Sequence, residues 1–188
     1  MLVCPPGYEP KSFDDYCPAT IYGESKVVTE TIINSYSDRL PEHIIFRPTS
    51  IWGPYFKEPY RDFFDMVLSR RYLRIGGCFA KKTYGYVENS CNQILSLSCC
   101  EFFEPVYYLG DEPINANDWS VLIASEAGIQ EPIEVPFFVI KLASLFGDVL
   151  FKLGLKFPLT SFRLNNMMTN NIYDPLPITF INIFKKIP

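Results

Sequence analysis

Residues 18–26 read PATIYGESK and place a tyrosine and a lysine four positions apart. Apolar residues recur at helical spacing from about residue 19 to residue 39, and Pro41 ends the pattern. We therefore predict a helix over this range. Tyr22 and Lys26 would then share one face of it, because residues four apart on a helix are neighbours.

This pairing has a chemical use. A tyrosine hydroxyl rarely loses its proton near neutral pH, and an ammonium group close by stabilises the phenolate. The tyrosine can then act as a general acid or base on a sugar hydroxyl. A Tyr-x-x-x-Lys pair also occurs by chance in many helices, so the pair alone favours a purely structural interpretation.

Short apolar segments alternate with helical ones along the rest of the chain, which predicts an α/β fold. Strands are expected at residues 1–4 (the end of a strand already under way), 43–46, 72–75, 83–87, 106–109 and 171–173. Further helices are expected at residues 62–70, at 88–98 with Glu88, Asn89 and Ser90 as caps, at 117–128 with Asn117 and Asp118 as caps, after Pro136, and after Thr160. Residues 47–59 carry three prolines and a glycine and are expected to form an irregular loop.

Composition narrows the class of protein. The 188 residues are 48% hydrophobic and 20% charged, which is ordinary for one globular domain. The net charge is −4 and basic residues occur singly or in small groups, so we expect no nucleic-acid partner. No Cys-x-x-Cys pair occurs and there is one histidine, so no metal site is expected. Reduced thiols in a cytoplasmic protein are the simplest interpretation of the six cysteines.

The most apolar segment, residues 135–155, is long enough to span a bilayer. Lys141, Asp148 and Lys152 interrupt it, and a charge at the centre of a bilayer is costly. We therefore expect a buried helix of a soluble protein and no firm membrane anchor. Peripheral membrane contact remains open. The N-terminal residues lack the pattern of a signal peptide.

Three segments occur in an order and spacing that carry more information than the pair alone. They are residues 22–26, YGESK, followed by Glu30 on the same helix; residues 47–54, RPTSIWGP; and residues 83–89, TYGYVEN. Together they resemble the extended short-chain dehydrogenase/reductase family, the NAD-dependent epimerases and dehydratases. The second segment is similar to the family's Arg-Pro-x-x-x-Tyr-Gly-Pro loop, and the third to its Tyr-x-x-Val-x-Asp junction. Trp52 and Asn89 replace the usual tyrosine and aspartate.

The resemblance implies a role for several residues. Tyr22 would be the catalytic acid or base, and Lys26 would bind the ribose hydroxyls of the nicotinamide cofactor. Pro48, Thr49 and Ile51 would line the same cofactor, which could be NAD or NADP.

On the substrate side, the resemblance places Ser50 nearer the sugar. Lys82 falls where related enzymes can direct a basic residue toward the substrate diphosphate, and Arg163 is a second candidate. For both, a solvated surface charge is the alternative interpretation.

The fold implied is the C-terminal part of a Rossmann-type parallel sheet with a smaller substrate-binding lobe, in one truncated domain over residues 1–188. Residues 1–50 and parts of 75–110 would belong to the Rossmann core, with the remainder mainly in the interleaved lobe. The chain has no glycine-rich phosphate loop, and the family's catalytic Ser or Thr would precede Met1. We therefore expect the chain by itself to bind NAD poorly and to turn over little or nothing.

The type of reaction follows from the same comparison. Nucleotide-sugar 4,6-dehydratases usually carry an Asp-Glu pair where this chain has Met1 and Leu2, which argues against dehydration. We predict an NAD(P)-dependent epimerase or reductase with a nucleotide-sugar substrate, and a homodimer formed through the Tyr22 helix. The alternatives are a non-catalytic or regulatory relative, and a dehydrogenase of a sterol-like apolar alcohol.

Overall fold

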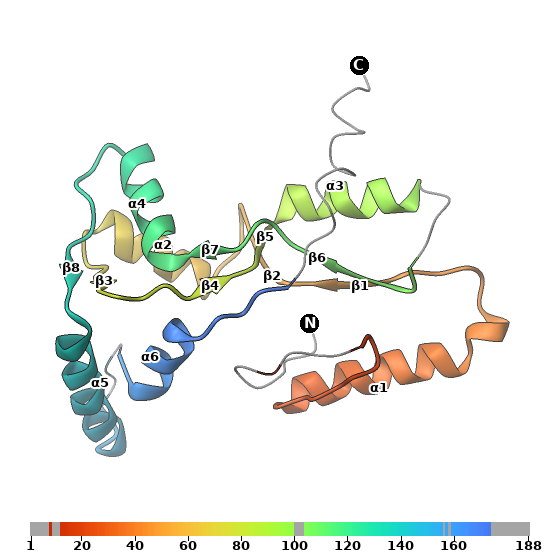
Figure 1. The fold of residues 1–188 in the computed structure, drawn as a ribbon, viewed down its shortest axis with the longest axis horizontal. Helices are drawn as coiled ribbons and strands as arrows, with labels where there is room; N and C mark the ends of the chain where they lie inside the picture. Colours follow the sequence, from red (N-terminus) through yellow and green to blue (C-terminus); the bar gives the residue numbers. More distant parts are fainter. Residues whose placement is uncertain (1–7, 9–11, 100–103, 156, 158, 174–188) are drawn as a thin grey trace. The chain divides into compact units, whose positions relative to one another are not determined.

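The computed structural model describes residues 8, 12–99, 104–155, 157 and 159–173 (Figure 1). The strand predicted at residues 1–4 lies outside these residues. The chain divides into two compact units, each assembled from separate segments. Unit 1 comprises Met1–Gly53, Thr83–Pro113 and Ile172–Pro188, and unit 2 comprises Pro54–Lys82 and Ile114–Asn171.

Unit 1 contains two pairs of parallel strands. Strand β1 (Ile45–Pro48) pairs with β6 (Val106–Leu109), and β2 (Ser50–Trp52) pairs with β5 (Tyr84–Tyr86). Parallel strands need a crossover connection, and α3 (Val87–Ser98) is the helix between β5 and β6. Buried Leu97 of α3 meets buried Leu109 of β6 in the core of this unit. The predicted α/β fold with parallel strand pairs is confirmed.

Helix α1 (Ile21–Ser35) lies where the sequence predicted a helix. The Thr20 hydroxyl accepts a hydrogen bond of 3.0 Å from the Gly23 amide and caps its N-terminus. The α-helix ends at Ser35, and a short 3₁₀ turn, η1 (Ser37–Arg39), follows it.

Two local predictions in unit 1 are wrong. Residues 47–59 are not wholly irregular, because β1 continues to Pro48 and β2 follows at once. Pairing with distant β5 and β6 supplies the hydrogen bonds of these strands. Glu88, Asn89 and Ser90 do not cap α3, which begins before them and has no side-chain cap.

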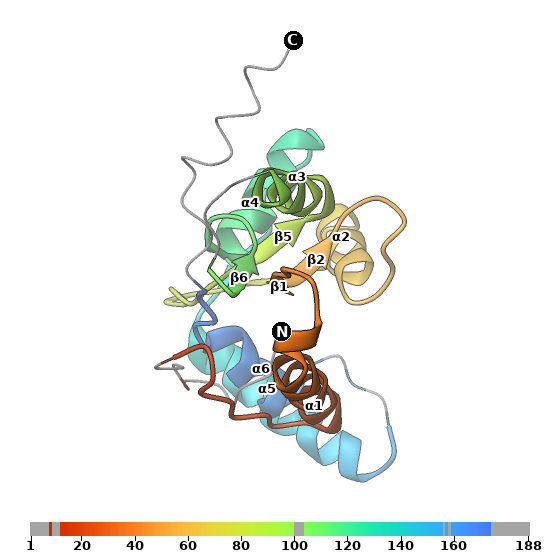
Figure 2. The same ribbon diagram turned by 90° about the vertical axis from the view of Figure 1, so that its right-hand side faces the viewer.

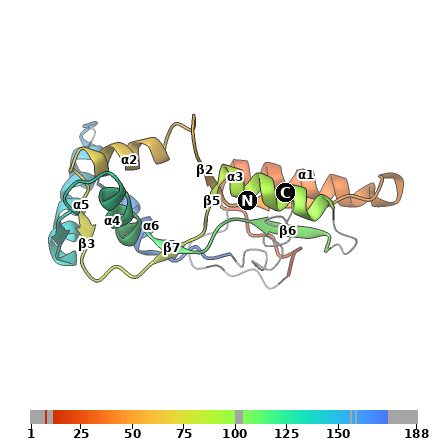
Figure 3. The ribbon, with the colours of Figure 1, turned by 90° about the horizontal axis from the view of Figure 1, so that it is seen from above.

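Unit 2 is built around α2 (Tyr60–Leu68) and α4 (Ala116–Glu126), which pack together through buried Val67, Tyr72 and Ala124 (Figure 1, Figure 3). The Asn115 side chain accepts a 2.7 Å hydrogen bond from the Asn117 amide and caps α4. The cap therefore lies two residues before the predicted one.

Short strands complete unit 2. Strand β3 (Arg74–Ile75) pairs in parallel with β8 (Glu134–Val135), and β4 (Lys81–Lys82) pairs antiparallel with β7 (Ile114–Asn115). The strand predicted at residues 171–173 is reduced to one isolated bridge between Lys82 and Asn171.

Helices α5 (Phe137–Lys152) and α6 (Ser161–Met168) form the rest of unit 2 and lie side by side (Figure 1, Figure 2). Buried Ile140 of α5 and Leu164 of α6 share a core with Ile75. Most of α5 is nevertheless exposed, so the prediction of a buried helix is wrong for all but one side of it. Among the described residues, no helix combines the length and the apolarity needed to cross a membrane.

Candidate functional site

Tyr22 and Lys26 lie on successive turns of α1, as their spacing predicts. The Lys26 ammonium is 5.2 Å from the centroid of the Tyr22 ring. The Tyr22 side chain is 59% exposed, so its hydroxyl is accessible to a ligand. An ammonium at this distance is within the range of a cation–π contact. The pair thus presents a phenolic hydroxyl and a cation together on one helix face.

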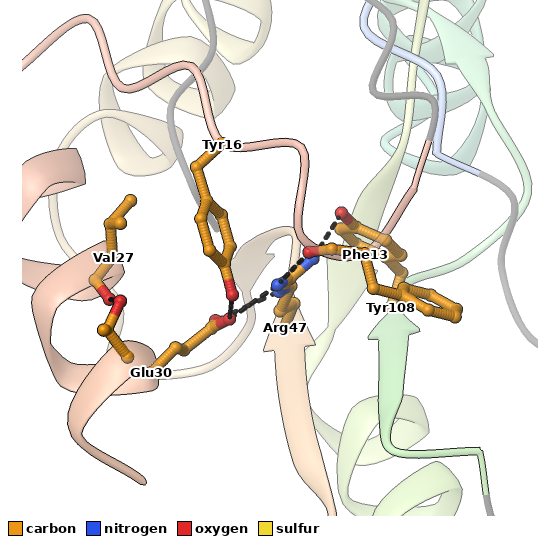
Figure 4. A network of polar contacts seen from close by, with 7 residues as sticks. Phe13, Tyr16, Val27, Glu30, Arg47 and Tyr108 are labelled. Atoms are coloured by element: carbon orange, nitrogen blue, oxygen red, sulfur yellow. Dashed lines mark hydrogen bonds and ion pairs between the residues drawn. The ribbon is translucent and has the colours of Figure 1, made fainter. Parts of the chain in front are cut away.

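A buried ion pair fastens this helix to strand β1 (Figure 4). Glu30 lies one turn beyond Lys26 on α1, and Arg47 lies on β1. The Arg47 guanidinium donates from Nε to one Glu30 oxygen at 3.0 Å and from Nη2 to the other at 2.5 Å. The Arg47 side chain is only 2% exposed. This two-pronged geometry fixes the distance and the rotation of α1 relative to β1.

Arg47 makes two further hydrogen bonds. It donates at 3.0 Å to the Tyr108 hydroxyl on β6 and at 2.8 Å to the Phe13 carbonyl. The Tyr16 hydroxyl donates to Glu30 at 3.2 Å, and the rings of Tyr16 and Tyr108 each lie 5.5 Å from the guanidinium. Figure 4 shows these groups converging on the one arginine. The network joins α1, the segment before it and two strands.

Arg47 keeps its positive charge within this network. Burial opposes the charged form of Arg47, but hydrogen bonds to Glu30 and Tyr108 outweigh it and raise the pKa of Arg47 above its ordinary value. Burial, together with the negative charge of Glu30, also raises the pKa of Tyr16. Tyr16 therefore remains a proton donor to the carboxylate at any ordinary pH.

Arg47 leads directly into the segment that the sequence assigned to a cofactor. The Thr49 amide donates at 2.9 Å to the Leu109 carbonyl, which carries the β1–β6 ladder one step past Pro48. Thr49 is buried, and its hydroxyl has no hydrogen-bond partner. Ser50 is exposed and Ile51 is half-buried, both on β2.

Strands β2 and β5 and helix α3 approach closely beside this segment, and a glycine makes the approach possible. A Cβ added at Gly85 would lie 2.8 Å from the Ile51 Cδ1 atom and 2.9 Å from the Ser90 Oγ atom. The Ser90 hydroxyl is buried and, like that of Thr49, has no hydrogen-bond partner. Two unsatisfied hydroxyls therefore lie close to one glycine, at 2.9 Å (Ser90) and 3.4 Å (Thr49) from a Cβ added to it, and buried polar groups normally have partners.

The carboxylate of Asp111 organises the junction between β5 and α3. It accepts hydrogen bonds from the Tyr86 amide at 2.6 Å and from the Asn89 side chain at 2.8 Å. Asn89 is thus a donor to a distant acid and not a cap.

The two basic residues predicted for the substrate diphosphate belong to unit 2. Lys82 is half-buried on β4, and burial lowers its pKa, although Cys78 partly opposes the shift. Arg163 is exposed on α6. Lys82 is linked to the segment that follows α6, because Lys82 forms a β-bridge with Asn171. Tyr22, Lys26 and residues 48–51 all belong to unit 1.

The sequence analysis gave no role to the Glu30–Arg47 pair, although both residues fell in motifs that it quoted. An acidic residue one turn after Lys26 and an arginine at the start of the second motif were the available signals. Tyr16 and Tyr108 gave none, since only the fold brings them to Arg47.

No protein-family model and no curated protein sequence matches this chain. Several solved structures are similar to this chain. UDP-glucuronic acid 4-epimerase from Bacillus cereus, in complex with UDP-glucuronic acid and NAD, has a TM-score of 0.56 at 15% identity, covering 72% of this chain and 45% of its own. The chain shares the fold of this epimerase.

Two further structures share the epimerase/dehydratase fold with this chain. UDP-glucose 4-epimerase from Thermotoga maritima gives a TM-score of 0.52 at 18% identity, covering 72% of this chain and 47% of its own. The dTDP-glucose 4,6-dehydratase from Bacillus anthracis, in complex with NAD, gives 0.52 at 17%, covering 72% and 46%. The chain thus spans about half the length of these structures. The likeness confirms the predicted resemblance at the level of the fold.

Proposed function

We propose that this chain forms the catalytic part of an NAD(P)-dependent epimerase or reductase that acts on a nucleotide sugar. The observation that carries the proposal is the Tyr22–Lys26 pair, with 5.2 Å between ammonium and ring, on a helix locked to β1 by Glu30 and Arg47. Solved structures that share the fold include epimerases of UDP-sugars, which supports this substrate class.

In the proposed mechanism, Tyr22 takes the proton from a sugar hydroxyl as the carbinol is oxidised and returns it on reduction. The bound nicotinamide supplies the hydride chemistry. Lys26 would donate hydrogen bonds to the ribose hydroxyls of the cofactor. The Glu30–Arg47 pair holds α1, which carries both residues, against β1, which leads into residues 48–51.

The residues present fit the nicotinamide end of the cofactor. The Thr49 hydroxyl is buried and without a partner in a segment that follows β1. It can donate to, or accept from, an amide or a ribose hydroxyl. Pro48 and Ile51 offer the apolar flank that a nicotinamide ring requires. The proposal assigns to this chain only that end of the cofactor, and NAD and NADP remain alternatives.

Ser50, Lys82 and Arg163 are assigned to the substrate. Ser50 is exposed one residue from Thr49 and can bind a sugar hydroxyl. Lys82 and Arg163 would bind the diphosphate. In this assignment unit 1 is the Rossmann core and unit 2 is the substrate lobe. By the family resemblance, Met1 and Leu2 would stand at the positions of the dehydratase acids, and their side chains cannot transfer protons, which supports epimerisation or reduction.

A homodimer through α1 belongs to the same proposal. Ile21, Val28 and Ile32 are large, exposed and spaced along one side of the helix. Sedimentation velocity would detect a dimer, and Ile32→Asp would dissociate it.

The deciding experiment measures NAD(H) binding and nucleotide-sugar turnover by the 188-residue chain and by a protein that also includes the coding sequence upstream of Met1. Both proteins are prepared in unmodified form and as two separate variants. Tyr22→Phe tests the proposed acid or base, and Tyr36→Phe is a matched control at the exposed C-terminal end of the same helix. We expect Tyr22→Phe in the longer protein to lower turnover by roughly 10²- to 10⁴-fold with cofactor binding kept. Tyr36→Phe should change neither quantity.

Equal turnover by Tyr22→Phe and the unmodified protein would refute the assignment of the acid or base. Cofactor binding without turnover of any nucleotide sugar would favour the non-catalytic relative or the dehydrogenase of an apolar alcohol. Tight NAD binding by the 188-residue chain alone would contradict the expectation that this chain binds NAD poorly.

A further inference from the structure

Helix α5 has a continuous exposed apolar side, and only its Leu145 edge borders the groove between α5 and α6. Its large side chains are each at least half exposed: Phe138, Leu142, Leu145, Phe146 and Val149. Their spacing places them on one side of the helix, and we call this set the apolar face of α5. The opposite side is buried in unit 2 through Ile140, Ser144 and Gly147. A helix that already buries one side therefore has a second apolar side without a polar residue in it.

The charges of α5 border this face. Lys141 and Lys152 are eleven residues apart, about three helical turns, so they lie along one edge. Asp148 lies on the same line, but its carboxylate accepts a 2.9 Å hydrogen bond from the Ser161 amide. That contact lowers the pKa of Asp148 and directs its charge toward α6. The edge of the apolar face is therefore lined by two lysines whose side chains are exposed.

Further exposed apolar side chains lie near the C-terminal end of α5 and on α6. Phe151, Leu153 and Leu155 are each more than half exposed at this end of α5, and Phe162 is exposed beside Ser161 on α6. The 16 residues of α5 are about 24 Å long, which is shorter than the ~30 Å hydrocarbon core of a bilayer. Such a helix can lie in the plane of a membrane surface but cannot cross it.

We propose that unit 2 docks on an anionic phospholipid surface through the apolar face of α5. The apolar side chains enter the boundary between headgroups and acyl chains. Lys141 and Lys152 extend their stems along this boundary and place their ammonium groups among the lipid phosphates.

The same charges disfavour a second copy as the occupant. In a two-fold pairing of antiparallel α5 helices, Lys141 of one copy would approach Lys152 of the other, and like charges repel. An anionic lipid surface complements both lysines, with each basic residue near it contributing about 1 kcal/mol.

The test is sedimentation of the 188-residue chain with vesicles of phosphatidylcholine alone and with added phosphatidylserine. The variants are Leu142→Asp on the apolar face and Leu122→Asp as a matched control, since Leu122 is equally large and is exposed on α4 of the same unit. We expect binding to phosphatidylserine vesicles that weakens with salt. Leu142→Asp should reduce it at least about tenfold, and Leu122→Asp only slightly. Circular dichroism of each variant confirms that it is folded.

A charge-neutralised variant, Lys141→Gln with Lys152→Gln, separates the two contributions and should reduce the preference for phosphatidylserine. Absence of vesicle binding, equal binding to both vesicle types, or equal effects of the two aspartate variants would each overturn the proposal. So would a dimer that Leu142→Asp dissociates, because the face would then pair two copies. Loss of binding in the protein that includes the upstream coding sequence would show that the protein covers this face itself, and would also overturn it.

Discussion

Arg47→Met removes the positive half of a buried ion pair and leaves the Glu30 carboxylate in the interior of unit 1. The carboxylate keeps one donor, the Tyr16 hydroxyl at 3.2 Å, and loses the two arginine hydrogen bonds at 3.0 and 2.5 Å. Breaking a buried pair by removing one partner typically costs 3–5 kcal/mol, so we expect a loss of roughly 4 kcal/mol in the free energy of unfolding.

The reference is an ion pair on the surface. Arg61 and Asp65 are 3.8 Å apart on α2, and their side chains are 70% and 65% exposed. Such pairs contribute about 0–1 kcal/mol, so Arg61→Met should leave stability nearly unchanged. The contrast between the two arginine variants isolates burial as the cause, because the side-chain replacement is identical.

Urea unfolding followed by tryptophan fluorescence measures the effect in the correct unit. The chain has two tryptophans, Trp52 in unit 1 and Trp119 in unit 2. In a Trp119→Phe background, the fluorescence of Trp52 reports the unfolding of unit 1 alone. Arg47→Met is compared in this background. Arg61→Met lies in unit 2 and is compared in a Trp52→Phe background, in which Trp119 reports the unfolding of unit 2.

The single variant Glu30→Met and the double variant Glu30→Met with Arg47→Met complete a double-mutant cycle. The double variant no longer buries an unpaired charge, so it should be more stable than Arg47→Met alone. A loss below about 1 kcal/mol for Arg47→Met, or strict additivity of the two single substitutions, would show that the network does not hold α1 to the sheet.

Two further predictions concern single residues. Burial lowers the pKa of Lys82, so the folded chain binds a proton there less readily than the unfolded chain, and stability rises with pH between the folded and the ordinary value. Lys82→Met should therefore raise the urea midpoint at pH 7, with a gain that shrinks toward about pH 10.4, whereas exposed Lys81→Met should change it little at either pH. Gly85→Ala should lower the stability of unit 1 by roughly 1–3 kcal/mol, because the new Cβ would lie 2.8 Å from Ile51 Cδ1 and 2.9 Å from Ser90 Oγ. Thermal unfolding of Gly85→Ala at the wild-type midpoint would contradict this close packing.

The elements that the sequence predicted well are those with local signals. Helix α1 lies within the predicted range, and residues after Pro136 and Thr160 form the expected helices α5 and α6. The Tyr22–Lys26 contact follows from helical spacing alone, so the fold adds little to that prediction.

The elements that the sequence did not predict depend on distant partners. Strand β2 lies between Pro48 and Gly53, which favour a loop, and it forms because β5 provides its ladder. The strand containing Lys82 is two residues long and has no local pattern. From the sequence alone, Glu30 has the pattern of a solvated helix charge. Its burial against Arg47 is set by the fold and is not indicated by the neighbouring residues. Burial of charge is set by tertiary contacts and not by periodicity.

The way the two units share the chain has a consequence for synthesis. Tyr173, which follows the last segment of unit 2, returns to unit 1, where its amide donates to the Thr83 hydroxyl at 3.0 Å and its ring stacks on Tyr108 at 5.2 Å. The Tyr108 hydroxyl also accepts a hydrogen bond from Arg47. A ribosome must therefore translate all of unit 2 before the surroundings of the buried arginine are complete. The helix that carries Tyr22 therefore reaches its final environment only after more than a hundred further codons have been translated.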